Sequence, residues 1–146
     1  MKPRVFLDTN VLMDLLLQRP GFESSAQILQ AGEDGRIELC CSFLTMANLA
    51  FILRKTATPA RLAPGLMQIQ SLVTVLSMDS EQLSDALKMD GKDFEDILQA
   101  VCAAKAGCTA IITSNQKDFQ INARSSEINI PPVFGPKEFM NRQSVL

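Results

Sequence analysis

The sequence of 146 residues contains no histidine. Histidine is the commonest general base near neutral pH and a frequent metal ligand. Its absence excludes every nucleophile arrangement in which a serine or cysteine is activated by histidine. Any chemistry of this protein must therefore use carboxylates, amides, hydroxyls, lysine or a bound metal ion.

The sequence also has no apolar run long enough to cross a bilayer. Its first residues, Met-Lys-Pro-Arg, lead directly into a strand-like run, with no signal-type cleavage region after them. No low-complexity block argues for disorder, and 47% of the residues are hydrophobic against 21% charged. We expect a cytoplasmic protein without membrane contact that folds as one domain over residues 1–146.

The chain has four cysteines and no excess of positive charge. Cys40 and Cys41 are adjacent, and Cys102 and Cys108 lie in or at the end of an apolar helix. These positions favour small core hydrophobes over a disulfide framework or a zinc site. The net charge is −2, so the whole chain has no electrostatic attraction for nucleic acid. If the substrate is nucleic acid, the attraction must be local or mediated by a metal ion.

What the sequence does have is an alternation of short apolar strands and helices, which is typical of parallel βαβ units. The expected strands are residues 4–7, 37–41, 73–78, 109–115 and, as a possible short fifth, 130–135. The expected helices are residues 10–18, 22–33, 43–55, 66–72, 79–89, 93–107 and 136–141, with prolines 59 and 64 interrupting the chain before the fourth of them. This order predicts an α/β fold: a three-layer α/β/α sandwich on a mostly parallel sheet of four to five strands.

Several polar side chains are predicted to meet at one edge of this sheet. In parallel α/β sheets, ligands bind at the carboxyl ends of the strands. An aspartate that leaves a buried strand loses hydration, so its charge needs a helix N-terminus, a basic partner or a cation. Several such carboxylates repel one another, and a hard cation such as Mg²⁺ or Mn²⁺ relieves the repulsion and supplies a reactive hydroxide. The residues that follow the expected strands there are Asp8, Ser42, Asp79, Thr113, Ser114 and Asn115, and Ser42 is also a plausible helix N-cap. The helix before the fourth strand adds Asp93 and Asp96, and the turn after that strand adds Asp118.

The same residues also have purely structural interpretations. Asp8 could be the N-cap of the helix that begins near residue 10, and Asp93 the N-cap of a later helix with Asp96 in its first turn. Asn115 and Asp118 could be ordinary turn residues. Their joint placement at one edge of the sheet favours a functional site.

Two segments resemble the PIN domain, a nuclease family that includes the VapC-type toxins of bacterial toxin–antitoxin pairs. They are FLDTNVLMDLLL at residues 6–17 and DFEDILQAVCAAKAGCTAIITSNQKDF at residues 93–119. The resemblance covers almost the full length and implies the same α/β/α sandwich. It also implies a Mg²⁺- or Mn²⁺-dependent endoribonuclease with an RNA substrate and a cognate antitoxin protein as partner.

The resemblance further assigns roles to individual residues. Asp8 and Asp96 match the first and third metal-binding acids of the family, and the turn after the fourth strand offers Asn115 and Asp118 for the fourth. It implies that Asp8, Asp96 and Asp118 hold the metal ion. The auxiliary residues near the metal would be Thr9, Asn10, Asp93, Thr113 and Asn115.

One position departs from the family pattern, because Asn48 stands where the family has a glutamate in the helix after the second strand. Asn48 lies on a helical stripe with Thr45 and Ile52, so its amide can face the site and ligate a metal ion or orient water. It cannot supply negative charge, which predicts weaker binding of a divalent cation. Two outcomes follow: a one-metal nuclease in which Asn48 joins the catalytic set, or a catalytically degenerate PIN-fold module that acts by binding protein or RNA.

Three further interpretations complete the analysis. A phosphotransfer domain with Asp8 as nucleophile would need a second aspartate two residues later, which this chain lacks. The apolar helix at residues 11–17 favours a surface for a homodimer or a partner, or simple burial in the core. Candidates for contact with RNA phosphates are Arg54, Lys55, Arg61 and Lys117, although scattered basic residues are usually just solvated surface.

Overall fold

The protein is built on a five-stranded sheet in the order β3-β2-β1-β5-β7, in which every pair of neighbours is parallel. The computed structural model describes residues 2–117, 119, 121–122 and 128–143, so Asp118 lies outside the described residues. The strands are β1 (Arg4–Leu7), β2 (Glu38–Ser42), β3 (Thr74–Leu76), β5 (Ala110–Ile112) and β7 (Val133–Phe134). The predicted mostly parallel sheet of four to five strands is confirmed.

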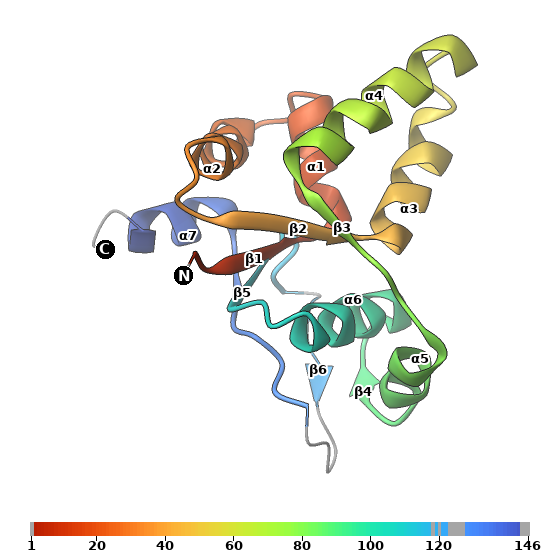
Figure 1. Cartoon of the computed structure of the whole chain (residues 1–146), viewed down its shortest axis with the longest axis vertical. Coiled ribbons are helices and arrows are strands. Elements are labelled where there is room, and N and C mark those ends of the chain that lie inside the picture. Colours follow the sequence, from red (N-terminus) through yellow and green to blue (C-terminus); the bar gives the residue numbers. More distant parts are fainter. Residues whose placement is uncertain (1, 118, 120, 123–127, 144–146) are drawn as a thin grey trace.

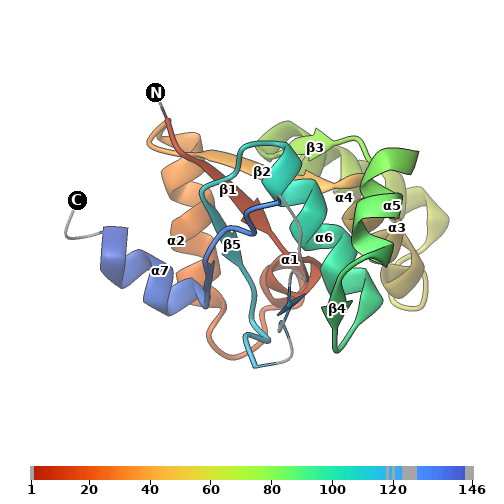
Figure 2. The ribbon, with the colours of Figure 1, turned by 90° about the horizontal axis from the view of Figure 1, so that it is seen from below.

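Helices cover both faces of the sheet, as Figure 1 shows edge-on and Figure 2 from below. On one face lie α1 (Thr9–Leu16), α2 (Phe22–Glu33), α3 (Phe43–Leu53) and α4 (Pro59–Leu72), and α7 (Pro136–Gln143) adds Phe139 to the same core. On the other face lie α5 (Ser80–Leu87) and α6 (Phe94–Lys105). Over the described part of the chain, no helix is long and apolar enough to span a membrane. The three-layer architecture is as predicted.

Alternate residues of the strands enter different cores, because successive side chains of a strand point to opposite faces. Val5 and Leu7 pack in the core under α1 to α4, while Phe6 packs against α6. In β2, Cys41 enters the first core and Cys40 the second. All four cysteines are buried with free thiols, as expected of small core hydrophobes.

The prediction for α4 was wrong at its start. Prolines were expected to interrupt the chain until residue 66, yet the helix begins at Pro59 and contains Pro64. Pro59 occupies the first turn, where a missing N–H costs nothing. The cost of Pro64 is overridden by burial, because Ile69 and its partly buried neighbours Leu66 and Leu72 join the core.

Smaller differences concern short elements and element ends. The predicted helix at residues 10–18 begins at Thr9 and ends at Leu16, and the predicted strand at residues 37–41 runs one residue further along. A separate antiparallel pair, β4 (Asp90–Gly91) with β6 (Ile121–Asn122), was not predicted. Strands of two residues carry too little periodicity to be recognised in a sequence.

The helix α2 approaches β2 closely at Gly32. A Cβ atom at this position would lie 2.6 Å from Cδ1 and 2.9 Å from Cγ of Leu39, which is itself buried. Separations of this size are shorter than van der Waals contact. Glycine is therefore required here for packing.

Candidate metal and active site

Asp8 follows directly on β1, the central strand, and the residue is only 6% exposed. Its backbone N–H donates to the carbonyl of Ile112 in the neighbouring strand at 2.9 Å. One carboxylate oxygen accepts from the backbone N–H of Thr9, so Asp8 is the N-cap of α1. The other accepts from the hydroxyl of Thr113 at 2.9 Å. Both carboxylate oxygens are thus fixed in direction at the end of the sheet.

Burial raises the pKa of the Asp8 carboxyl above its ordinary value. The bonds from Thr113 and Thr9 oppose this shift, and the negative charge of Asp93 adds to it. A buried carboxylate that has only neutral donors and a like charge nearby is an electrostatic cost to the fold. Such a cost at a strand end is typical of a functional group.

The hydroxyl of Thr113 links Asp8 to two of the predicted auxiliary residues. It accepts from the amide nitrogen of Asn10 at 3.3 Å and from the backbone N–H of Asn115 at 3.1 Å. The amide oxygen of Asn10 in turn accepts from the backbone N–H of Ser114 at 2.9 Å. The turn after β5 and the start of α1 are therefore held together at the site.

The first turn of α6 brings further carboxylates to the same edge. Asp93 is the N-cap of α6, and one of its oxygens accepts from the backbone N–H groups of Glu95 and Asp96 at 2.8 and 3.4 Å. The capping interpretation is confirmed for Asp93, as it is for Asp8. Each of these carboxylates can cap its helix and also bind a ligand, because a carboxylate can accept more than two hydrogen bonds.

Two cavities open at this edge and share Asp8, Asn10 and Asp96. The first, of about 420 Å³, is lined by Asp8, Asn10, Lys92, Asp93, Asp96 and Asn115. The second, of about 220 Å³, is lined by Asp8, Thr9, Asn10, Met13, Arg19, Ile52, Glu95 and Asp96. The structure thus brings together all the predicted site residues that it describes except Asn48 and Thr113, which bond to residues of the lining.

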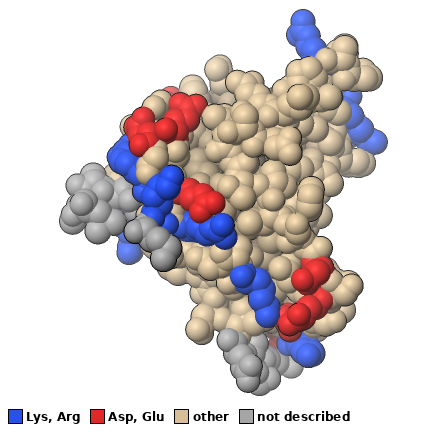
Figure 3. All heavy atoms as spheres, in the orientation of Figure 1, with Lys and Arg blue, Asp and Glu red and all other residues tan. Residues whose placement is uncertain are grey.

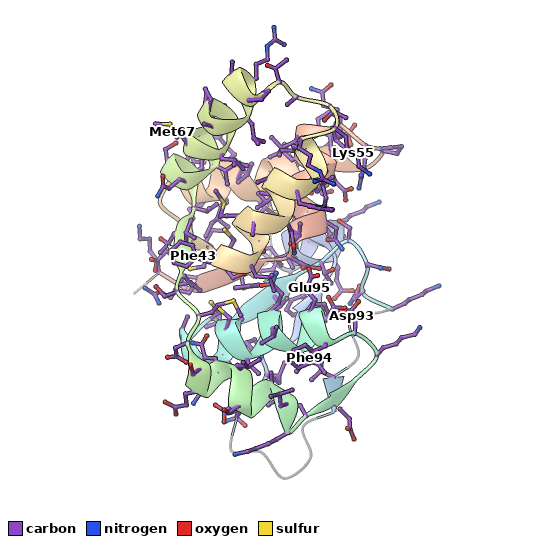
Figure 4. All side chains as sticks on the ribbon, turned by 90° about the vertical axis from the view of Figure 1, so that its right-hand side faces the viewer. Phe43, Lys55, Met67, Asp93, Phe94 and Glu95 are labelled. Atoms are coloured by element: carbon purple, nitrogen blue, oxygen red, sulfur yellow. The ribbon has the colours of Figure 1, made fainter. Side chains whose placement is uncertain are left out.

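Asn48 does not reach the cavities itself but contacts Glu95, a residue that we did not predict. The amide nitrogen of Asn48 donates to Oε1 of Glu95 at 2.6 Å. Figure 4 shows Glu95 at the junction of α6 with α3, above Asp93 in that view. Burial and the charges of Asp93 and Asp8 raise the pKa of Glu95, and the bond from Asn48 opposes that shift. A carboxylate therefore lies beside the position where the family pattern has one.

A buried polar network lies beneath the site and was also not predicted in full. Gln99 of α6 is fully buried, donates to the hydroxyl of Thr45 at 2.8 Å and accepts from the hydroxyl of Ser42 at 2.6 Å. Thr45 also accepts from the hydroxyl of Thr9 at 3.2 Å. The network joins α1, β2, α3 and α6. The signal in the sequence was a lone glutamine within the apolar run of α6, three residues after Asp96.

The donor set suits a hard divalent cation. Carboxylate and amide oxygens converge on the shared cavity wall, and Mg²⁺ is commonly held by one or two carboxylates with water in its other positions. Among the residues that the structure describes, no group of three aspartate, glutamate or cysteine side chains could hold an ion by itself. Asp8 and Asp96 could therefore hold such an ion together with water.

The fold and this edge define an α/β protein with an acidic site at the carboxyl end of its central strand. A sequence profile of the PIN domain matches residues 4–117, and the chain belongs to the PIN domain family. It is 27% identical over 122 residues to Ribonuclease VapC1 of Aquifex aeolicus (strain VF5), which covers 80% of this chain and 83% of that protein. The predicted resemblance is confirmed.

Solved structures share the fold. VapBC2 from Rickettsia felis, bound to a DNA fragment from its promoter, superposes with a TM-score of 0.68 and 14% identity over 90% of this chain and 98% of that chain. DNA-bound VapBC from Salmonella typhimurium gives a TM-score of 0.67 and 17% identity over 92% and 98%. At these identities the likeness concerns the arrangement of helices and strands.

Proposed function

We propose that this PIN domain is a metal-dependent endoribonuclease and the toxin component of a toxin–antitoxin pair. The observation that carries the proposal is the buried carboxylate of Asp8, which shares both cavity walls with Asp96. The name of the similar Aquifex aeolicus protein, a ribonuclease, supports the same activity. Asp8, Asp96 and Asp118 are the proposed ligands of Mg²⁺ or Mn²⁺.

When bound, the ion would activate water and offset charge on the phosphoryl oxygens. The residues of the chain position the reactants. Thr9 and Thr113 fix both oxygens of Asp8, and Asn10 and Asn115 hold Thr113 in place. Because both oxygens of Asp8 are oriented before any ligand arrives, little reorganisation is needed on binding.

Asn48 is proposed to act through Glu95. Its bond to Oε1 of Glu95 keeps that carboxylate at the wall of the smaller cavity, where it can accept a proton from water. Asn48 thus remains in the proposed catalytic set as a positioning residue.

The test is cleavage of single-stranded RNA with Mg²⁺ or Mn²⁺ by the native protein and by Asp8→Asn. A matched control is Asp79→Asn, because Asp79 also follows a strand and caps a helix, with Oδ1 accepting from the N–H of Gln82, yet it lines neither cavity. We expect Asp8→Asn to abolish cleavage and Asp79→Asn to retain it. Equal cleavage by all three proteins would refute the site.

The alternative is a catalytically degenerate module that binds protein or RNA, and the uncharged side chain of Asn48 is the observation in its favour. It predicts an inert native protein, restoration of cleavage by Asn48→Glu, and loss of that gain when Asp8→Asn is added. Cleavage by the native protein decides against it.

For the partners we propose a cognate antitoxin and a homodimer. The similar solved structures include the two VapBC assemblies above and a toxin–antitoxin complex from Klebsiella pneumoniae. Large apolar side chains of α3 and α4 are exposed, among them Phe43, Phe51 and Met67 at 59%, 59% and 66%, and Figure 3 shows a broad uncharged area over this part of the molecule. The helix at residues 11–17 buries Val11, Leu12 and Met13 in the core and leaves Leu16 and Leu17 exposed. The two exposed leucines support the proposal of a partner surface. Co-expression with the product of a small adjacent reading frame tests the partner: it should co-purify and suppress cleavage.

A further inference from the structure

Each of the two cavities at the acidic edge contains one basic side chain. Lys92 lines the larger cavity and Arg19 the smaller, and the wall between them is formed by Asp8, Asn10 and Asp96. We infer that single-stranded RNA crosses this wall, with the phosphate on one side of the cleaved bond held by Arg19 and the phosphate on the other side held by Lys92. The inference rests on the proposed nuclease function and adds two subsites to it.

Electrostatics explains why such subsites are needed. The net charge of the chain is −2, and Asp8, Asp93, Glu95 and Asp96 all line the two cavities. A phosphate backbone that approaches this edge meets like charge, which disfavours binding. A basic side chain in each cavity, Arg19 or Lys92, offsets the repulsion of the RNA backbone on both sides of the acidic wall.

The end of α1 places Arg19. Gln18 has a left-handed backbone (φ 49°), the N–H of Arg19 donates to the carbonyl of Asp14 at 2.9 Å, and the N–H of Gln18 donates to the carbonyl of Leu15 at 3.3 Å. This pair of bonds is a Schellman motif, in which the residue after the left-handed one folds back over the helix end. A non-glycine residue in this conformation is under strain. The left-handed turn at Gln18 carries the chain back over the helix end, and Arg19 lines the smaller cavity.

The contact of the Arg19 side chain with Asp14 uses only part of its hydrogen-bond donors. Its Nη1 donates to Oδ1 of Asp14 at 3.3 Å, and the arginine side chain is 48% exposed against 19% for that of Asp14. A guanidinium has five N–H donors in a planar fork that matches phosphate oxygens. The contact with Asp14 therefore orients Arg19 and leaves donor capacity for a phosphate.

In the larger cavity, the group proposed to bind phosphate is the side chain of Lys92 and not the N-terminus of α6. A helix N-terminus often binds phosphate through its free N–H groups. Here the N–H groups of Glu95 and Asp96 already donate to Asp93. Lys92 lines the larger cavity beside them, and its ammonium group would act on a phosphate as a point charge.

The four basic residues considered from the sequence are placed differently. The linings of the two cavities include none of Arg54, Lys55, Arg61 and Lys117. The guanidinium of Arg54 lies 3.9 Å from the ring centre of Phe51, and Figure 4 shows Lys55 well away from Glu95 along α3. Arg19 and Lys92 are therefore better placed to contact the phosphates next to the cleaved bond.

The first experiment measures binding of a fluorescein-labelled, mixed-sequence RNA of 12 nucleotides by anisotropy, in EDTA to prevent cleavage, between 0.05 and 0.5 M salt. Each lost phosphate contact on a single strand reduces the slope of log K against log salt by about 0.7. We expect this reduction for both Arg19→Gln and Lys92→Gln, with about fivefold weaker binding at 0.1 M salt. The double variant should lose about 1.4 from the slope.

The chain offers a matched control for each variant. Arg36 is an exposed arginine that pairs with an aspartate near a helix end, like Arg19, but lines a different cavity. Lys105 is at the opposite end of α6 from Lys92, about 18 Å along the helix. Arg36→Gln and Lys105→Gln should leave the slope unchanged.

A second experiment assigns the sides. After the cleaved bond of the 12-nucleotide RNA is mapped, a neutral methylphosphonate replaces the phosphate one linkage upstream or one linkage downstream. Each substitution should slow the native protein, Arg19→Gln should be insensitive to one of them, and Lys92→Gln to the other.

The results separate this inference from the proposed function. If the native protein cleaves RNA and Asp8→Asn does not, but Arg19→Gln and Lys92→Gln behave like their controls, the subsites are refuted and the nuclease stands. If the native protein neither binds nor cleaves RNA, both are refuted.

Discussion

The amide nitrogen of Asn48 lies 2.6 Å from Oε1 of Glu95 and joins α3 to the first turn of α6 at the edge of the site. The family pattern has a carboxylate at position 48, and the structure has one on the neighbouring helix instead. The acid and the amide occupy the same junction from opposite helices. Position 48 itself carries no carboxylate, but the carboxylate of Glu95 lies directly beside it.

Asn48→Glu should consequently destabilise the protein in EDTA at pH 7 by about 1 kcal/mol, because it replaces a donor with a second carboxylate beside Glu95. Urea unfolding measures the loss. Adding Mn²⁺ should reverse part of it. The loss should disappear near pH 3.5, where carboxyl groups are protonated, and also in the double variant Asn48→Glu/Glu95→Gln. A loss that persists in that double variant would mean that the contact with Glu95 is not its cause.

Asp8→Asn should raise the thermal unfolding midpoint at pH 7. Burial raises the pKa of the Asp8 carboxyl in the folded protein, so its protonated form is favoured there. Its contribution to stability is fully present below the pKa of the unfolded chain and is lost as the pH rises through the higher folded-state pKa. The stability advantage of Asp8→Asn should therefore grow from pH 3 to pH 7.

Calorimetry of both proteins over that pH range measures this difference. Mn²⁺ should raise the midpoint of the native protein and leave that of Asp8→Asn unchanged, since a ligand stabilises only the protein that binds it. A variant that is less stable than the native protein at pH 7 would contradict the assignment of Asp8 as an electrostatic cost.

Gln99→Leu should cost about 1–3 kcal/mol of unfolding free energy, although leucine is close to glutamine in size. The variant leaves the buried hydroxyls of Ser42 and Thr45 without their glutamine partner. Denaturant unfolding measures the loss, and Gln70→Leu on the exposed side of α4 is the control, expected within about 0.5 kcal/mol of the native protein. Equal effects of the two variants would show that the network contributes nothing to stability.

Gly32→Ala and Gly65→Ala should have opposite effects, although both positions lie inside helices. A Cβ at position 32 would clash with buried Leu39, for a loss of about 1–3 kcal/mol. A Cβ at position 65 would meet no atom within 4 Å, so alanine should stabilise α4 by about 1 kcal/mol. Thermal unfolding of both variants checks the signs, and Leu39→Val should relieve part of the loss at position 32.

The sequence was sufficient for the sheet, the layers and much of the site, because each depends on local patterns. Strand-length apolar runs predicted the sheet, and capping residues such as Asp8 and Ser42 marked the helix starts. The same residues emerge at the carboxyl ends of parallel strands, which lie at one edge by geometry. The order of strands and helices was therefore enough to predict which polar residues lie at this edge of the sheet.

Contacts between helices could not be derived in this way. Glu95 and Gln99 belong to the site because they form hydrogen bonds with Asn48 and Thr45 of α3 where the two helices meet at the end of the sheet. No spacing within either helix encodes that approach. Arg19 was missed because the direction of the chain at this residue depends on the left-handed backbone conformation of Gln18, which only a glycine would have indicated in the sequence. The start of α4 was missed because burial of Ile69 outweighs the local cost of Pro64.

The capping role of Asp93 affects how related sequences should be read. Asparagine and serine cap helices about as well as aspartate, so a relative that has lost its nuclease activity could change this residue and still fold equally well. A relative with aspartate, asparagine or serine at this position keeps the cap, so any of these three residues at position 93 is compatible with loss of the activity. In a comparison of homologues, position 93 therefore reports on the fold, whereas position 96, which is not the cap and is proposed to hold the metal ion, would report on the activity.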